Sequence, residues 1–313
     1  MSVTTPQSAE TILVPLDGSA AAEVVVPVAM LLARHLPAQV NLLHVIERDA
    51  PQRVHGERHL TTEAEAAAYL RGFAERFAAE GIPVSWHVHM APVGNVPLSI
   101  AAHAAEADAD LIVLSAHGAG DPRSWLTGAV AQGVIRHAAP PVLLLRTDAK
   151  RGEPPFAPEE VTVAIDPERQ GEAALPAALE LARALDVPLR LMMVVPTVET
   201  LPGDQAAAAR LLPSGAAAAL DLEQSVAADY LRGLADRIKA IEPGVPVVTE
   251  VVRGDPADAL RAAMRARPRV MALATHGRAG FDALWSGSIG SKTIARGGGP
   301  FLLVHPEPAS ATS

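Results

Sequence analysis

Short, continuously apolar runs alternate with longer amphipathic stretches along almost the whole chain. Runs such as Leu111–Leu114 and Val142–Leu145 contain no polar position, which is typical of strands covered on both faces of a parallel sheet. Stretches such as Glu63–Glu80 repeat apolar residues at helical spacing, and this one is followed by Gly81. Strands that alternate with helices predict βαβ units and therefore a parallel sheet.

The pattern predicts the same order of elements twice. In the first half the predicted strands are Thr11–Pro15, Val40–Ile46, Pro83–Met90, Asp110–Ser115 and Pro141–Arg146, and the helices are Ala20–His35, Glu63–Glu80, Val96–Glu106 and Ser124–His137. In the second half the strands are Val161–Ile165, Pro188–Val195, Val245–Val252, Val270–Thr275 and Pro300–His305, and the helices are Gly171–Leu185, Ala217–Ile241, Pro256–Arg267 and Ser286–Arg296. The stretch Thr197–Gly215 contains Pro and Gly and is predicted to be a loop that holds an insertion.

Individual motifs also recur between the halves. Tyr69-Leu-Arg-Gly returns as Tyr230-Leu-Arg-Gly, and His117-Gly118 returns as His276-Gly277. A separation of about 160 residues fits two whole domains and is too long for the units of a solenoid. We therefore predict two flavodoxin-like, Rossmann-like α/β domains, over residues 1–147 and 159–306, each with a five-stranded, mainly parallel sheet and helices on both faces.

The composition narrows the classes of function. Apolar residues make up 49% of the 313 residues and aromatic residues only 3%, so the cores must be built from Ala, Val and Leu. The absence of cysteine excludes disulfides, thiol catalysis and cysteine-ligated zinc. The arginines of Arg261–Arg269 are interpreted as a solvated helix end, where positive charge is favourable.

Charge and hydropathy also bear on partners and location. The net charge of −9 argues against a nucleic-acid partner, because neutralising phosphates needs a basic face. No segment has the roughly 20 apolar residues of a membrane span, and residues 1–10 lack the basic and apolar regions of a secretory signal. We therefore expect a cytoplasmic protein with neither a nucleic-acid nor a membrane partner.

Two aspartates follow the first strands of the two halves, at the edge where a doubly wound sheet binds its ligands. They are Asp17 and Asp166. Either carboxylate can accept hydrogen bonds from adenine or ribose groups, and either can equally serve as a turn or N-cap residue.

A histidine–glycine pair follows the fourth predicted strand of each half, at His117-Gly118 and His276-Gly277. A second glycine comes ten residues later, at Gly128 and Gly287. Glycines let backbone N–H groups approach a phosphate, and a helix N-terminus attracts negative charge. The shared spacing therefore favours a phosphate-binding loop, in which the two histidines either contact the ligand or stabilise the turn.

Together these segments resemble the universal stress protein family. The resemblance rests on Val14-Pro-Leu-Asp17-Gly-Ser, Leu42-Leu-His44-Val45, Gly254-Asp255-Pro256, Ala109-Asp-Leu-Ile-Val and the two His-Gly segments with their second glycines, and it covers both halves, as in tandem members. The ATP-binding branch of the family carries Gly-x2-Gly-x9-Gly-(Ser/Thr). The second half departs from that pattern only at Ala274, whereas the first half departs at both ends, at Ser115 and Ala129.

The resemblance implies an adenine nucleotide α-hydrolase-like fold and a set of site residues. Asp17 and Asp166 would face adenine or ribose, and Val45 and Val194 would offer backbone bonds to the base. The full nucleotide-binding set is Asp166, Val194, Thr275, His276, Gly277, Gly287, Ser288 and Ile289 in the second half, with Asp17, Val45, Gly118 and Gly128 in the first. No catalytic residue or metal ligand is predicted, although the spacings of His55 with His59 and of His87 with His89 leave a metal open.

The function implied by the resemblance is that of a stress-response protein that binds ATP or a related adenine nucleotide, with or without Mg²⁺. We expect slow turnover or none, because the loop supplies chiefly backbone amides, whereas phosphoryl transfer needs cations and a positioned nucleophile. The alternatives are a dimerising interaction protein that binds no nucleotide and a slow ATPase. Because family members pair through their last strands, Val142–Arg146 and Phe301–His305 are expected to pair the domains within the chain, and a homodimer is a further option.

Overall fold

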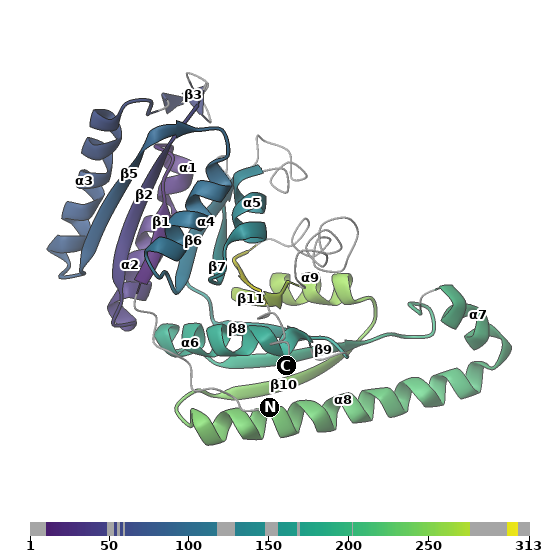
Figure 1. Cartoon of the computed structure of the whole chain (residues 1–313). Helices are drawn as coiled ribbons and strands as arrows, with labels where there is room; N and C mark the ends of the chain where they lie inside the picture. The colour runs from purple at the N-terminus through teal and green to yellow at the C-terminus, as the bar shows by residue number, and fades with distance from the viewer. Residues whose placement is uncertain are drawn as a thin grey trace, which may run out of the picture. The chain divides into compact units, whose positions relative to one another are not determined.

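The computed structural model describes residues 11–48, 53–54, 57–58, 60–117, 129–147, 156–167, 170–201, 203–275 and 299–305 (Figure 1). The chain divides into two compact units. The N-terminal unit comprises Gln7–Phe156 together with Pro300–His305, and the C-terminal unit is built from Ala157–Gly299. Each unit is an α/β structure with its own sheet order and its own helices.

The N-terminal unit is organised around a sheet with the strand order β12-β7-β6-β1-β2-β5. Neighbouring strands are parallel, except that β12 runs antiparallel to β7. The strands are β1 (Thr11–Pro15), β2 (Gln39–Glu47), β5 (Val84–Val93), β6 (Leu111–His117), β7 (Val142–Thr147) and β12 (Phe301–Val304). A separate antiparallel pair, which the sequence did not predict, is formed by β3 (Arg53–Val54) and β4 (Glu57–Arg58).

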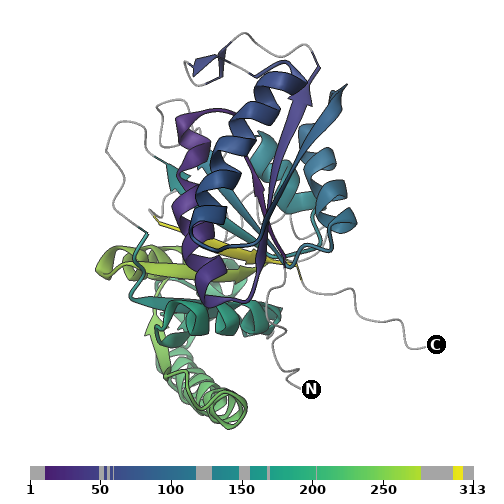
Figure 2. The same cartoon turned by 90° about the vertical axis from the view of Figure 1, so that its left-hand side faces the viewer.

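Side-chain caps begin several helices of the N-terminal unit. The side chains of Ser19, Thr62 and Asn95 each accept a hydrogen bond from a backbone N–H in the first turn of the following helix. The helices are α1 (Ala20–Glu23), α2 (Val25–His35), α3 (Glu63–Ala79), α4 (Val96–Glu106) and α5 (Ala129–His137). Figure 2 shows α2 and α3 on one face of the sheet and α4 on the other.

The predicted helix Ala20–His35 is divided at Val24 into α1 and α2. Pro27 explains the break, because it has no N–H to donate to the carbonyl of Glu23 one turn earlier. The rest of the predicted span is helical and packs against the sheet through apolar residues.

The C-terminal unit has four strands in the order β10-β9-β8-β11 among its described residues, all parallel. They are β8 (Glu160–Ile165), β9 (Leu189–Val195), β10 (Val247–Arg253) and β11 (Arg269–Ala274). The helices are the 3-10 helix η2 (Gln170–Ala174), α6 (Leu175–Leu185), α7 (Gly203–Leu211), α8 (Pro213–Ile241) and α9 (Pro256–Ala266). This order repeats that of the N-terminal unit, so the sequence repeat is also a structural one.

The prediction of a loop over Thr197–Gly215 is wrong for most of this segment, because α7 and the start of α8 occupy it. The alanine runs Ala206–Ala209 and Ala216–Ala219 have high helix propensity, and Pro213 is tolerated at a helix start. α8 has 29 residues and β10 has 7, so the helix is about 43 Å long against about 24 Å for the strand. Its buried residues accordingly begin only at Leu220, and Figure 1 shows its N-terminal part running past the strands.

The predicted fold class is confirmed, since both units are α/β with mainly parallel strands. The buried core consists chiefly of Leu, Val, Ala and Ile, as the composition requires. The predicted helix Ser286–Arg296 lies outside the described residues. Within the described part of the chain, no helix combines the length and the apolar character that crossing a membrane requires.

Candidate functional site

Strand register brings three predicted site residues of the C-terminal unit into one row. β8 lies between β9 and β11. The β8–β9 register ends with Ile165 opposite Met193, and one more residue brings Asp166 level with Val194. The β8–β11 register ends with Val163 opposite Ala272, and three more residues bring Asp166 level with Thr275. The row stands at the carboxyl ends of the strands, where α/β sheets bind ligands.

The Asp166 carboxylate also fixes the turn that follows β8. Its Oδ1 accepts a hydrogen bond from the N–H of Gly171 at 2.6 Å. Gly171 lies so close to β8 that a Cβ atom would come within 2.4 Å of the Ala164 carbonyl oxygen, so this turn requires glycine. Oδ2 of Asp166 makes no hydrogen bond to another described residue.

Asp17 has a similar local role in the N-terminal unit. Its Oδ1 accepts hydrogen bonds from the N–H and the hydroxyl of Ser19, at 2.9 and 2.6 Å. Gly18, between them, has a φ of +90°, which glycine adopts without strain. Both aspartates are thus turn residues, one of the two roles expected of them, and their ligand role stays a prediction.

Val45 and Thr275 are buried, with exposed fractions of 8% and 0%. The ladder between β2 and β5 shifts register between Val45 and Glu47. Val45 itself is still paired with His89, so the irregularity falls after it, and its role toward a base stays a prediction. Thr275 directly follows β11 and supports the strand end from within the core.

The other predicted nucleotide-binding residues lie outside the described residues. They are Gly118 and Gly128 of the first half and His276, Gly277, Gly287, Ser288 and Ile289 of the second. His117 ends β6, at the same edge of the sheet as Asp17.

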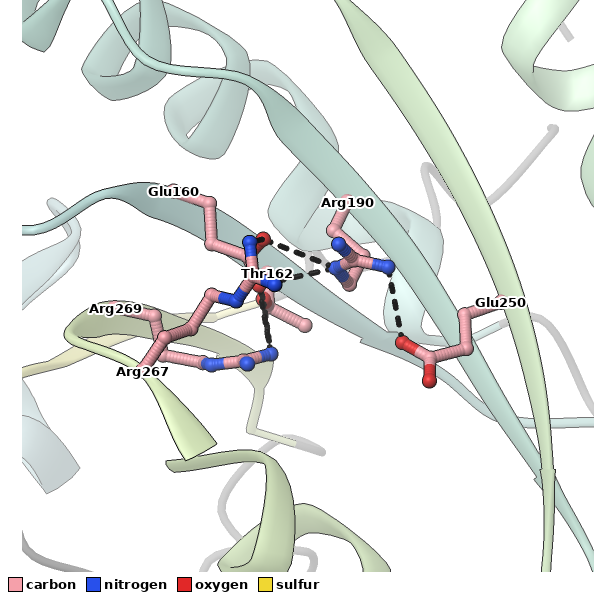
Figure 3. Close-up of polar contacts among 6 residues, drawn as sticks. All are labelled: Glu160, Thr162, Arg190, Glu250, Arg267 and Arg269. Carbon is pink, nitrogen blue, oxygen red and sulfur yellow. Dashed lines mark hydrogen bonds and ion pairs between the residues drawn. The ribbon is translucent and has the colours of Figure 1, made fainter. Parts of the chain in front are cut away.

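A cluster of charged residues occupies the opposite, amino ends of the strands in the C-terminal unit (Figure 3). Glu160 begins β8 and Arg269 begins β11, and the register pairs the two residues. Oε1 of Glu160 lies 2.7 Å from Nη1 of Arg269 and 3.0 Å from Nε of Arg190. The hydroxyl of Thr162 donates to the same oxygen at 3.0 Å. Glu160 is only 1% exposed, so these partners compensate a buried charge.

Two further residues complete this arginine cluster, which consists of Arg190, Arg267 and Arg269 with Glu160 and Glu250. Nη1 of Arg190 lies 3.0 Å from Oε2 of Glu250, and Nη1 of Arg267 lies 3.6 Å from Oε2 of Glu160. Burial raises the pKa of Glu160, but the hydrogen bond from Arg190 and the charges of Arg269 and Arg190 outweigh it and lower the pKa overall. The interpretation of Arg261–Arg269 as a solvated helix end is therefore wrong for Arg269, which is buried.

A group of histidines lies on β5 and α4 of the N-terminal unit. The rings of His87 and His103 stack with their centroids 4.8 Å apart. Nε2 of His103 lies 3.4 Å from Nδ2 of Asn41, and its Nδ1 lies 3.9 Å from a carboxylate oxygen of Glu106. Across the described part of the chain, no group of three potential ligand residues is arranged to hold a metal ion, so the spacing of His87 and His89 gains no support as a metal site.

Comparison with known proteins identifies the family of this chain. The model of the universal stress protein family matches residues 9–146 and again residues 159–305. The chain belongs to the universal stress protein family. The double match confirms the tandem arrangement. A curated universal stress protein of Mycobacterium tuberculosis is 26% identical over 302 residues, which cover 91% of this chain and 92% of that protein.

Solved structures of universal stress proteins share the fold over nearly the whole chain. One from Archaeoglobus fulgidus aligns with a TM-score of 0.65 and 19% identity, covering 96% of this chain and 97% of its own. A putative universal stress protein from Pseudomonas aeruginosa aligns with a TM-score of 0.64 and 15% identity, covering 96% of this chain and 94% of its own. At such identities the likeness shows the fold alone.

Proposed function

We propose that the chain binds ATP or a related adenine nucleotide at the strand ends of its C-terminal unit and responds to it without efficient turnover. The observation that carries the proposal is the row of Val194, Asp166 and Thr275 at adjacent strand ends. Oδ2 of Asp166 would accept a hydrogen bond from a ribose hydroxyl or the adenine amino group. Family membership supports the proposal, because Gly277 and Gly287 match the glycines of the ATP-binding branch.

The chemistry of the loop favours binding over catalysis. Backbone amides beside Gly277 and Gly287, together with the hydroxyl of Ser288, would hold the phosphates at a helix start. These neutral donors do little to offset the charge that phosphoryl transfer develops. The function we propose is therefore a cytoplasmic sensor or regulator of the stress response, with Mg²⁺ accompanying the phosphates when ATP is bound. A slow ATPase is the second candidate.

Mass spectrometry of small molecules released from purified protein tests the ligand class. We expect an adenine nucleotide in stoichiometric or near-stoichiometric amount, and calorimetric binding of ATP after its removal. A preparation that releases no nucleotide and gives no heat with ATP would contradict the proposal. It would favour an interaction protein that works through its sheets.

Substitution of Asp166 tests whether its carboxylate binds the nucleotide. Loss of a charge-assisted hydrogen bond costs about 1.5–3 kcal/mol, so Asp166→Ala should weaken ATP roughly tenfold or more and leave inorganic triphosphate binding unchanged. Asp166→Asn is the matched variant, because it keeps an acceptor for the Gly171 N–H and separates the turn from the ligand. Unaltered ATP affinity in both variants would reduce Asp166 to a turn residue.

Paired glycine substitutions test which half binds. Gly287→Val should weaken ATP binding far more than Gly128→Val, because Ser288 follows the first glycine and Ala129 the second. Calorimetric titration of both variants gives the comparison. Equal losses would contradict the proposed asymmetry.

We also propose that the two halves pair within the chain through their last strands. β12 pairs antiparallel with β7 and all its residues are buried. A chain that ends at Gly299 would leave β7 as an apolar edge, which favours association with other chains. We expect this truncated chain to form larger assemblies than the full chain in analytical ultracentrifugation. Identical sedimentation of the two would contradict the pairing.

A further inference from the structure

The arginine cluster of the C-terminal unit carries more positive than negative charge. Its guanidinium groups belong to Arg190, Arg267 and Arg269, and its carboxylates belong to Glu160 and Glu250. Both kinds of group are charged at neutral pH, so one cation is in excess. Among the least exposed members, Arg190, Arg269 and Glu160, the cations also outnumber the carboxylate. Buried charge is unfavourable unless it is compensated, so this excess calls for a partner.

Arg269 is the most buried of the three arginines and keeps one unsatisfied donor. Its side chain is 4% exposed, and its Nη1 contacts Glu160 at 2.7 Å and the hydroxyl of Thr162 at 3.2 Å. Its Nε atom is buried and has no hydrogen-bond partner among the residues that the structure describes. Burial lowers the pKa of Arg269; the attraction of Glu160 opposes this, and the charges of Arg190 and Arg267 add to it. Buried donors without a protein partner commonly bind a water molecule or an ion.

Arg267 connects the cluster to solvent. Its side chain is 49% exposed, and its contact with Glu160, at 3.6 Å, is longer than the 3.0 Å contact that Arg190 makes. Since Glu160 already accepts hydrogen bonds from Arg190 and Thr162, Arg267 keeps donors for another acceptor. Figure 3 shows the guanidinium groups of Arg190 and Arg267 gathered at the Glu160 carboxylate, with Arg269 beside them.

We infer that the arginine cluster binds a small oxyanion of the phosphate or sulfate type, held by Arg267 and by the unsatisfied Nε of Arg269. A tetrahedral oxyanion supplies the missing negative charge and several acceptor atoms that match the donors of guanidinium groups. Glu160 and Glu250 hold Arg190 and Arg269 in place and so preorganise the site.

This oxyanion site is separate from the proposed nucleotide site. Glu160 and Arg269 begin β8 and β11, whereas Asp166 and Thr275 follow the far ends of the same strands. β8 has 6 residues, so the two edges are about 20 Å apart. The site is also confined to one unit, because Asp110 stands before β6 where Arg269 begins β11.

Thermal unfolding of the full chain tests the inference, with chloride replaced by inorganic phosphate or by sulfate at constant ionic strength. We expect the unfolding midpoint to rise with the logarithm of oxyanion concentration, as for a ligand that binds only the folded protein. In calorimetry, Arg267→Gln should weaken phosphate at least tenfold. Arg265→Gln, which removes the same charge from an exposed position on α9, should bind phosphate like the unchanged chain.

Two further measurements distinguish phosphate binding at the arginine cluster from phosphate binding elsewhere in the chain. Gly287→Val should keep the phosphate response, because the proposed nucleotide loop is not involved. Acetate should bind more weakly than phosphate, because a monoanion with two acceptor atoms meets fewer donors. The inference is overturned if chloride and phosphate stabilise equally, if Arg267→Gln binds phosphate as the unchanged chain does, or if the response disappears in Gly287→Val.

Discussion

The amino ends of β1 and β8 carry different polar groups on the same backbone framework. Thr11 begins β1 where Glu160 begins β8, and Asp110 precedes β6 where Arg269 begins β11. In the N-terminal unit the backbone N–H of Thr11 donates to Oδ2 of Asp110 at 3.0 Å, and Gln39 donates to the Thr11 hydroxyl at 3.1 Å. In the C-terminal unit the corresponding positions form a buried ion pair.

The difference shows that the shared backbone places a polar residue at this strand start in both units, and that the charge of this residue can be negative or positive. When position 269 carries a cation instead of an anion, the neighbouring strand must supply the carboxylate, and Glu160 does so in direct register. The N-terminal unit is held there by hydrogen bonds of modest strength, whereas the C-terminal unit depends on compensated charges. Breaking one member of a compensated set costs more than losing a single neutral hydrogen bond.

The largest effect is therefore expected from Glu160→Gln. Removing the buried carboxylate leaves Arg269 and Arg190 without their main counter-charge, and such a loss costs about 3–5 kcal/mol. The matched change in the N-terminal unit is Thr11→Val, which removes the hydroxyl that accepts from Gln39 and should cost about 1 kcal/mol. Urea unfolding followed by peptide-resolved hydrogen exchange assigns each loss to its unit.

A second variant keeps this comparison testable if Glu160→Gln does not fold. In Glu160→Leu combined with Arg269→Leu, both charges of the registered pair are absent, so the double variant should be more stable than Glu160→Gln. A double variant that is less stable, or equal losses for Glu160→Gln and Thr11→Val, would show that the charges do not dominate this end of the C-terminal unit.

The next effect concerns glycines that allow close approach in each unit. A Cβ atom at Gly171 would come within 2.4 Å of the Ala164 carbonyl oxygen, and one at Gly133 would come within 2.4 Å of the Pro97 ring. At Gly171 the clash is with the backbone of β8, which cannot move easily, whereas at Gly133 the helices α4 and α5 can shift apart. Gly171→Ala should therefore lower the free energy of unfolding by about 2–3 kcal/mol, and Gly133→Ala by about 1 kcal/mol. Thermal unfolding measures both.

Gly233→Ala is the control for this pair, because nothing lies within 4 Å of its added Cβ. It lies inside α8, where alanine is favoured over glycine by about 1 kcal/mol, so it should be neutral or stabilising. If Gly171→Ala behaves like Gly233→Ala, the close approach at the end of β8 does not constrain the sequence.

These contrasts also show what the sequence could and could not reveal. Local pattern located β1 and α4 to the residue, because an apolar strand and the cap at Asn95 are read from neighbours in the chain. It missed α7, because Pro and Gly nearby suggested a loop. It misjudged Arg269, because its partner Glu160 is distant in sequence and becomes adjacent only through strand register.

The candidate site was predictable for the same reason that the strands were. Asp166 directly follows β8 and Val194 is the next-to-last residue of β9, so their place near strand ends can be read from the pattern, and the continued register then adds Thr275 to the row. The use of Asp166 Oδ1 in the Gly171 turn could not be derived, because it depends on how η2 folds back on β8. The glycine loop remains a prediction from sequence.

Acid should weaken the C-terminal unit through Glu160. The pKa of Glu160 is lower in the folded protein than in the unfolded chain, so its contribution is fully present above the unfolded pKa of about 4.3 and is lost as pH falls through the folded value. The loss should not exceed that of Glu160→Gln, which removes the same charge and likewise keeps a polar group for hydrogen bonds. Unfolding in urea from pH 6 downward measures it, and an acid limb as steep in Glu160→Gln as in the unchanged chain would contradict the assignment.

The smallest effect on stability is expected from protonation of His103 in the N-terminal unit, near neutral pH. The His103 side chain is 13% exposed, and burial together with His87 lowers its pKa, with Glu106 opposing and His89 adding to the shift. Unfolded His103 therefore takes up a proton at a pH where folded His103 does not, so stability falls as pH drops below about 6.5 and continues to fall until the folded value is passed. His103→Gln should flatten this slope in hydrogen exchange of α4, whereas His137→Gln, at an exposed position on α5, should leave it unchanged. An equal slope in the unchanged chain and in His103→Gln would show that the stacked histidines do not couple protonation to the folding of this unit.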